Sequence, residues 1–129
     1  MTIIRPPAVA GSFYPADADI LQSEIDGLMD AALHSDLMDD DVTPKAIIVP
    51  HAGLMFSGAI AALGFATVRA LKGQIKRIVI VGPAHRMAFQ GIALAKADGF
   101  ATPLGTVKCD LAGLQTALSW PQVQILDDA

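Results

Sequence analysis

Two short apolar runs stand out in the hydrophobic pattern of the chain. Residues 45–49 (KAIIV) and 77–81 (RIVIV) carry no internal charge, are rich in β-branched side chains, and are bounded by Pro and Gly. This composition is typical of buried parallel strands. Residues 57–71 between them are expected to be helical, so the span predicts a strand–helix–strand unit.

Apolar residues with the spacing of an amphipathic helix precede this unit. Either Asp17 or Asp19 can cap a helix, because a carboxylate accepts hydrogen bonds from the first backbone N–H groups. The apolar stripe of that helix consists of Ile20, Leu21, Ile25, Leu28, Met29, Ala32 and Leu33. His34 follows it, either capping the helix C-terminus or solvated, and an acidic loop is expected over residues 36–41.

The alternation continues after the second apolar run. Residues 91–95 and 123–126 are expected to be strands, and residues 101–105 have turn chemistry. Asp110 can cap a helix that runs through Leu118. Strands alternating with helices predict an α/β fold, and 129 residues predict one domain over 1–129.

A histidine follows each of the two main apolar runs. A right-handed crossover would make the runs parallel, so His51 and His85 would leave the sheet at the same edge, where ligands bind. Imidazole is a common ligand of iron, zinc and copper, and two histidines with one carboxylate hold Fe(II) in many oxygenases. The alternative is that each histidine is a hydrogen-bonded structural residue.

The loop after His51 offers a second feature. Ser57 is a candidate N-cap, and the N–H groups of the following helix could hold an anion beside His51. The alternative is simple capping. Leu54, Met55 and Phe56 either line an apolar substrate pocket or belong to the core.

Composition narrows the function classes. The chain is 53% hydrophobic, and its mean hydropathy of +0.48 is high for a small domain. Either a sheet buried on both faces or apolar surface covered by another element fits this value. A net charge of −4 without a basic cluster makes nucleic acid and anionic membranes poor partners. Residues 46–68 carry no charge, but Pro50, Gly53, Gly58 and Gly64 argue against a membrane span.

Cysteine content and the chain start bear on location. The single cysteine, Cys109, excludes an internal disulfide and is expected to be structural. The first residues lack the apolar core of a signal peptide. We therefore expect a cytoplasmic protein. The run 39–41 lacks the Gly and Glu of a calcium loop and is expected to be solvated.

Several motifs now occur in one order along the chain. They are Gly11-Ser12-Phe13-Tyr14-Pro15, Pro50-His51-Ala52-Gly53 with Ser57-Gly58, Val81-Gly82-Pro83-Ala84-His85, and Thr102-Pro103-Leu104-Gly105 with Asp110. Together they resemble the Memo family, whose bacterial members are called AmmeMemoRadiSam system protein B. The resemblance covers almost the whole chain.

The resemblance implies a fold and a site. The family's fold is similar to that of class III extradiol dioxygenases, a three-layer α/β sandwich with a mostly parallel central sheet. His51 and His85 match two metal-binding residues of the family, with Fe(II) the expected metal and copper or zinc as alternatives. Candidate residues for a substrate or an anion are Tyr14, Gly53, Phe56, Ser57 and Arg86.

Two functions are compatible with the family. One is an Fe(II)-dependent dioxygenase-type oxidoreductase acting on a small aromatic substrate. The other is a non-catalytic module that binds metal or peptide, since family members are also described as binders of phosphotyrosine-containing peptides. A half-domain that is inert alone is a third possibility.

The chain departs from the family pattern at its site. Arg86 stands where the family commonly has a second histidine, and Leu54 and Phe56 stand in a loop where it favours tyrosines. These changes remove possible proton donors, so no catalytic base can be named. Arg86 could bind an anionic substrate group or be an ordinary surface arginine.

The largest departure is length. Family members continue through a further segment that supplies the remaining metal ligand, so this chain resembles the N-terminal half of such a protein. Asp98, Cys109 and Asp110 are the only candidates for a third ligand within it, and no motif supports them. We expect a fragment, a homo-oligomer, or a second chain that supplies the missing half.

Overall fold

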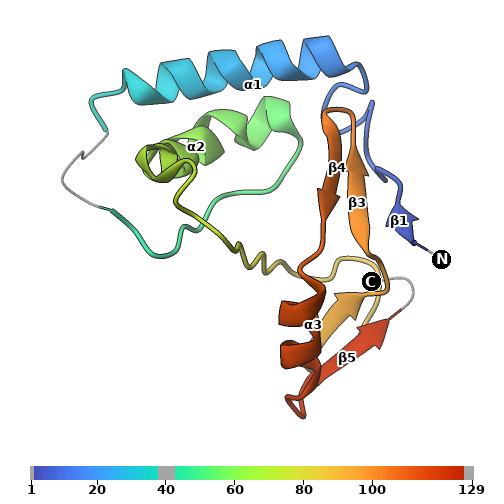
Figure 1. Cartoon of the computed structure of the whole chain (residues 1–129). Coiled ribbons are helices and arrows are strands. Elements are labelled where there is room, and N and C mark those ends of the chain that lie inside the picture. The colour runs from blue at the N-terminus through green and yellow to red at the C-terminus, as the bar shows by residue number, and fades with distance from the viewer. Residues whose placement is uncertain (1, 38–42, 127–129) are drawn as a thin grey trace. The chain divides into compact units, whose positions relative to one another are not determined.

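The computed structural model describes residues 2–37 and 43–126 and has an α/β fold (Figure 1). The chain divides into two compact units, which are described separately. The helical unit is Ala8–Lys76, and the strand unit combines Met1–Pro7 with Arg77–Ala129. Residues 38–41 of the acidic loop expected at 36–41 lie outside the described residues.

The first helix of the helical unit confirms the sequence pattern. Helix α1 spans Ala18–Leu33, and the Asp17 carboxylate accepts the Ile20 N–H at 3.0 Å as its N-cap. His34 ends the helix as expected: its backbone N–H and its imidazole Nδ1 both contact the Asp30 carbonyl, the latter at 2.8 Å. The predicted cap and the predicted end of this helix are therefore both confirmed.

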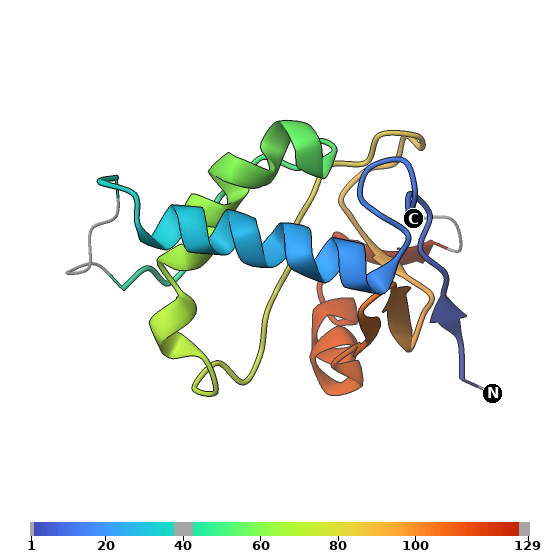
Figure 2. The ribbon, with the colours of Figure 1, turned by 90° about the horizontal axis from the view of Figure 1, so that it is seen from above.

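The second helix lies beside the first. Helix α2 spans Leu54–Ala66 and is followed by a short 3₁₀ turn, η1, at Arg69–Leu71. Figures 1 and 2 show α1 and α2 side by side, crossing at an angle. The helix begins three residues earlier than the predicted range of 57–71 and stops at Ala66.

Small side chains allow the two helices to approach closely. The buried contact is built from Ala32 of α1 and from Ala62 and Ala66 of α2. At Gly58 a β-carbon would come within 2.8 Å of Leu28 Cδ1, so glycine provides the room that this leucine fills. Close packing of this kind is sensitive to a single added methyl group.

The first sheet of the strand unit contains β1 (Ile4–Arg5), β3 (Gly99–Thr102) and β4 (Gly105–Lys108), in the order β1-β3-β4. β1 is parallel to β3, whereas β3 and β4 form an antiparallel hairpin. The turn predicted at 101–105 is confirmed, but the hairpin around it was not predicted. The Thr102 hydroxyl fixes the turn by accepting the Leu104 N–H at 3.2 Å and donating to the Gly105 carbonyl at 2.8 Å.

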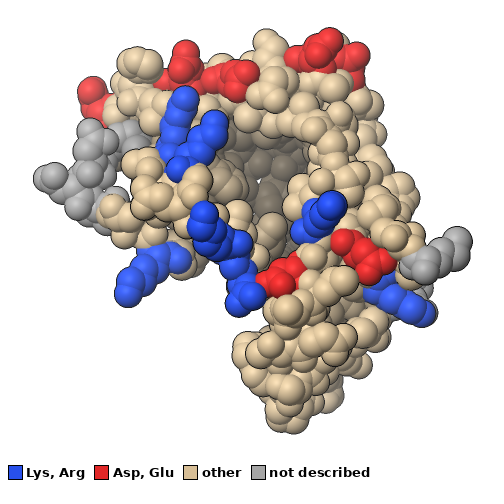
Figure 3. All heavy atoms as spheres, viewed as in Figure 1, with Lys and Arg blue, Asp and Glu red and all other residues tan. Residues whose placement is uncertain are grey.

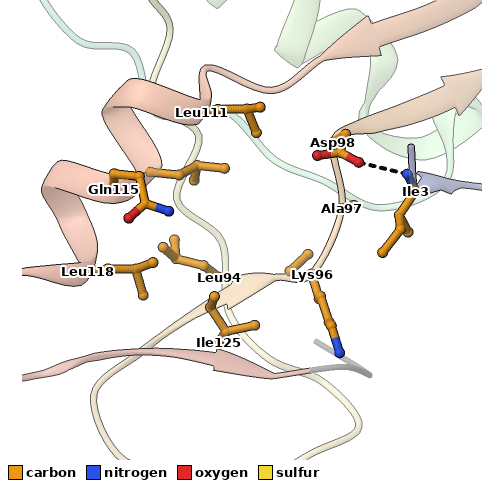
Figure 4. A pocket seen from close by; sticks show the side chains of 11 residues that line it. Ile3, Leu94, Lys96, Ala97, Asp98, Leu111, Gln115, Leu118 and Ile125 are labelled. Atoms are coloured by element: carbon orange, nitrogen blue, oxygen red, sulfur yellow. Dashed lines mark hydrogen bonds between the residues drawn. The ribbon is translucent and has the colours of Figure 1, made fainter. Parts of the chain in front are cut away.

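The second sheet pairs β2 (Ile92–Ala95) with β5 (Val123–Leu126) in parallel, which confirms both predicted strands. Helix α3 spans Leu111–Leu118 and carries the predicted Asp110 cap, which accepts the Gly113 N–H at 3.0 Å. Figure 4 shows the leucines of α3 facing Leu94 and Ile125 across a cavity of about 160 Å³. Most of the side chains that line this cavity are apolar, and Lys96, Asp98 and Gln115 line it as well.

The prediction of strands at 45–49 and 77–81 is wrong for the described residues. Among the described residues neither segment forms a helix or a strand, and none of these residues pairs with either segment in a sheet. They fall in different units, and a strand requires a hydrogen-bonded neighbour to exist as one. The predicted crossover sheet between them is consequently not formed by the described residues.

The described chain has very little buried core. Within residues 2–37 and 43–126, four apolar side chains are buried: Leu21, Ala32, Ala62 and Ala66. None of the helices in this part of the chain is long and apolar enough to cross a membrane. Parallel pairing with helices nonetheless fits the expected α/β class and a three-layer sandwich.

A matched pair of glycine substitutions tests the packing on α2. At Gly64 an added β-carbon would lie 2.5 Å from Val49 Cγ1, whereas Gly27 on α1 has nothing within 4 Å. Gly27→Ala should raise the free energy of unfolding by up to about 1 kcal/mol through helix propensity. Gly64→Ala should instead lower it, because overpacking costs about 1–3 kcal/mol. Urea denaturation measures both, and equal stabilisation by the two variants would contradict the Val49 contact.

Candidate functional site

The loop that carries His51 is fixed by the helix that follows it. His51 is exposed and lies just before Gly53, the N-cap of α2. The buried Ser57 hydroxyl donates back to the Ala52 carbonyl at 3.0 Å and lies 3.3 Å from the Gly53 carbonyl. These contacts hold the loop against the first turn of α2, so the backbone beside His51 has a defined conformation.

The N-terminal arm lies against the same loop. The Leu54 N–H donates to the Phe13 carbonyl at 2.7 Å, and a β-carbon at Gly53 would lie 3.5 Å from that oxygen. Gly11 turns the arm with a φ of 82°, in the left-handed region that glycine tolerates. Tyr14, half-buried, follows in the same arm. The structure thus brings together the Gly11–Pro15 and Pro50–Gly53 motifs, which are far apart in sequence.

The proposed N-cap role of Ser57 is wrong. Helix α2 begins at Leu54, so Ser57 lies inside its first turn and its hydroxyl serves as a donor to loop carbonyls. The N–H groups of Leu54, Phe56 and Ser57 already donate to Phe13 and Gly53 carbonyls. Because these donors are engaged, little is left at this helix start for an anion. Anion binding by Gly53 and Ser57 remains a prediction.

The three apolar residues that follow Gly53 differ in their surroundings. Leu54 lines an apolar groove of about 500 Å³ between α1 and α2. Met55 and Phe56 are instead 79% and 80% exposed, so neither is a core residue in the described chain. Neither of them lines that groove.

His85 lines a pocket in the strand unit. The pocket has a volume of about 300 Å³ and combines residues 82–87 with Arg5, Phe89 and Ala93. It brings together His85, Arg86 and Arg5, so one imidazole and two guanidinium groups share one cavity. Sequence reasoning found His85 and Arg86 but missed Arg5, because nothing in an N-terminal strand of two residues points to a loop more than 75 positions later.

The two histidines belong to different units, His51 to the helical unit and His85 to the strand unit. Within residues 2–37 and 43–126, no group of three or more His, Cys, Asp or Glu side chains could hold a metal ion. The histidine-pair hypothesis therefore rests on the sequence motifs.

The candidates for a third ligand have structural roles. The Asp98 carboxylate accepts the Ile3 N–H at 2.7 Å, as the dashed line in Figure 4 marks. Asp110 caps α3 and also forms an ion pair with Arg77. Cys109 is half-buried, and its backbone N–H donates to the Asp98 carbonyl. Both carboxylates are thus engaged in holding the strand unit together.

Comparison with known proteins identifies the family. A model of the Memo-like proteins matches residues 5–128. The MEMO1 family protein of Aquifex aeolicus is 33% identical over 118 residues, which are 92% of this chain and 41% of the relative. The chain belongs to the Memo family. Memo-family relatives from Ignicoccus hospitalis and Methanobrevibacter smithii are 38% and 31% identical, with 84% and 98% of this chain covered.

The match contains both histidine motifs. The Memo model covers His51, His85 and the Arg5 and Arg86 side chains of the strand-unit pocket. The chain spans 39% to 47% of the length of these three Memo relatives. More than half of each relative therefore lies outside the aligned part.

Replacing Ser57 tests the architecture of the His51 loop. Ser57→Ala removes the donor to the Ala52 carbonyl and should lower the free energy of unfolding by about 1 kcal/mol. Amide hydrogen exchange should rise for residues 51–53 in particular. Ser12→Ala is the control, because that exposed hydroxyl donates to the Val9 carbonyl within its own turn. Unchanged exchange at residues 51–53 would show that Ser57 does not hold the loop.

Asp110 gives a prediction about pH. The Gly113 N–H and then the Arg77 guanidinium lower the pKa of Asp110 below its ordinary value of 3.8. A depressed pKa means that the contribution of this carboxylate to stability is complete above that ordinary value and is lost as pH falls through the folded pKa. The start of α3 should therefore loosen in acid, as followed by the Gly113 amide resonance.

Asn at the same position separates the charge from the cap. Asp110→Asn keeps a side-chain oxygen for the N-cap but loses the ion pair with Arg77. The acid transition of the Gly113 amide should disappear in this variant. If the transition persists, another group is responsible for it.

Proposed function

We propose that this Memo-family chain contributes His51 and His85 as two imidazole ligands of a non-haem metal site with dioxygenase-type oxidoreductase activity. The observation that carries the proposal is the family match over 5–128, which contains both histidine motifs in order. Each histidine lies in a loop after a short apolar segment of the sequence. Side chains in such loops can be presented to a ligand.

The two histidines provide part of the ligand set that a metal ion needs. Neutral imidazole suits Fe(II), zinc and copper, and Fe(II) is the metal we propose. A two-histidine, one-carboxylate site needs a third ligand, and the described residues gather no third donor with the histidines. That ligand would come from polypeptide other than the described residues. When bound, Fe(II) would supply open positions for O₂ and an aromatic substrate.

The residues around His85 support an anionic substrate. Arg5 and Arg86 line the same cavity as His85, and guanidinium groups bind carboxylate and phosphate through paired N–H donors. We propose that they orient an acidic group or a catecholate oxygen of the substrate. Tyr14 and Phe56 are proposed as further substrate contacts.

A non-catalytic binding module is the second candidate. The two arginines of the His85 pocket also favour it, since a peptide with a phosphorylated or acidic side chain offers the same anionic chemistry. In that case the histidines would not be required for the ligand to bind. Cytoplasmic location is a proposal under both functions.

Metal affinity tests the histidine assignment. Fe(II) binding, measured anaerobically by titration and by metal content, should weaken about tenfold or more in His51→Ala and in His85→Ala. His34→Ala is the matched control, because His34 only ends α1 and should leave Fe(II) binding unchanged. Equal affinity in the three variants and the unmodified chain would contradict the metal site.

The same variants separate enzyme from binding module. An oxidoreductase should consume O₂ in the presence of a catechol, and either histidine variant should abolish that consumption. A binding module should keep its affinity for a phosphotyrosine peptide in both histidine variants and lose it in Arg86→Ala.

A further inference from the structure

The groove between α1 and α2 lies entirely within the helical unit. Ile25, Leu28 and Met29 of α1 line it, together with small residues of α2 such as Gly58 and Ala61. The small residues leave room beside the helix, so the groove stays open although the two helices pack closely next to it. Its volume of about 500 Å³ is within the range of about 300–1,000 Å³ that is typical of small-molecule sites.

The apolar part of the groove follows most of α2. Leu54 at the start of the helix and Phe65 near its end both line the groove. At about 1.5 Å per residue, the helix between them is roughly 16 Å long, which is close to the length of an extended dodecanoate chain. Phe65 is 50% exposed. An alkyl chain in the groove would cover this aromatic surface and would itself leave water.

The charged residues of the groove are both basic. Arg69 is the first residue of η1 and Lys72 is its C-cap, so both follow the end of α2. Both side chains are exposed, and neither forms a side-chain hydrogen bond or an ion pair with residues 2–37 and 43–126. An anion that reaches this end of the groove would therefore find two positive charges that no described carboxylate neutralises.

The acidic residues of α1 do not line the groove. Figure 3 shows acidic side chains along α1, which carries Asp19, Glu24, Asp26 and Asp30, and basic side chains over α2. None of these four carboxylates is among the described residues of the groove. The charge of the groove is thus positive, although the net charge of the chain is −4.

We propose that this groove binds a long-chain alkyl carboxylate, with the alkyl chain between α1 and α2 and the carboxylate at Arg69 and Lys72. Such a molecule carries its only charge at one end, as the groove does. The guanidinium and ammonium groups can both donate charge-assisted hydrogen bonds to the carboxylate oxygens. The helices supply the apolar contacts, which contribute most of the affinity.

This site is separate from the proposed metal site. Neither His51 nor His85 lines the groove. Fe(II) binding can therefore fail while the carboxylate binds, and the converse also holds. The titrations below contain a chelator, so that a metal does not contribute to them.

Calorimetric titration of the chain with dodecanoate, below its critical micelle concentration, tests the proposal. One saturable site is expected. Octanoate is four methylenes shorter and should bind at least tenfold more weakly, because each buried methylene contributes about fourfold to the affinity. Dodecanol lacks the anion and should bind about fivefold more weakly or less tightly still. Absence of saturable dodecanoate binding, or equal affinity for dodecanol, would overturn the proposal.

Variants at the two cations test the position of the carboxylate. Arg69→Gln and Lys72→Gln should each weaken dodecanoate binding by about threefold, as for an exposed ion pair. The double variant should bind dodecanoate no better than dodecanol. Lys76→Gln is the matched control, because Lys76 is an exposed cation of the same unit that does not line the groove. If it weakens binding as much as the double variant does, Arg69 and Lys72 do not hold the carboxylate.

A larger side chain in the groove tests the position of the alkyl chain. Ala61→Phe should fill the groove and weaken dodecanoate binding by about tenfold or more. Ala59→Phe is the control, since Ala59 is exposed on the same helix and does not line the groove. Circular dichroism checks that both variants fold, and unchanged affinity in a folded Ala61→Phe would overturn the proposal. A stable dimer of the chain that Ala61→Phe disrupts would also overturn it, because a second copy would then occupy the groove.

Discussion

The close contact between α1 and α2 is the interaction on which the helical unit depends. Alanines at the contact and glycine at position 58 let Leu28 seat against α2, and this is where the buried core of the described chain is found. The same helix start fixes the His51 loop through Ser57 and receives the N-terminal arm through Leu54. The packing of α1 against α2 thus positions the loop that carries His51.

Local signals in the sequence were sufficient to predict several helix ends and strands. The Asp17 and Asp110 caps, the end of α1 at His34, and the strands β2 and β5 follow from capping chemistry and short apolar runs. The β3–β4 hairpin was missed because both of its strands begin with glycine, a residue that is uncommon in strands, and both flank the turn residues. Ser57 was misplaced because Gly53 can end a loop as an N-cap without any side-chain signal.

The predicted strands at 45–49 and 77–81 failed for a different reason. Their composition is that of buried strands, yet a strand is defined by a neighbour, and the described chain provides none. The apolar side chains of these segments stay exposed, so a chain of high mean hydropathy has only a small buried core among its described residues. At the site, sequence alone indicated His51, His85 and Arg86 as candidates, while the contribution of Arg5 to the His85 pocket required the fold.

Amide hydrogen exchange of the chain by itself tests this account most directly. If residues 46–49 and 78–81 are strands without neighbours, their amides should exchange within about tenfold of the rate for an unstructured peptide, while α1 and α2 remain protected. Protection of both segments comparable to that of β2 and β5 would contradict the account. It would show that the chain completes its own sheet.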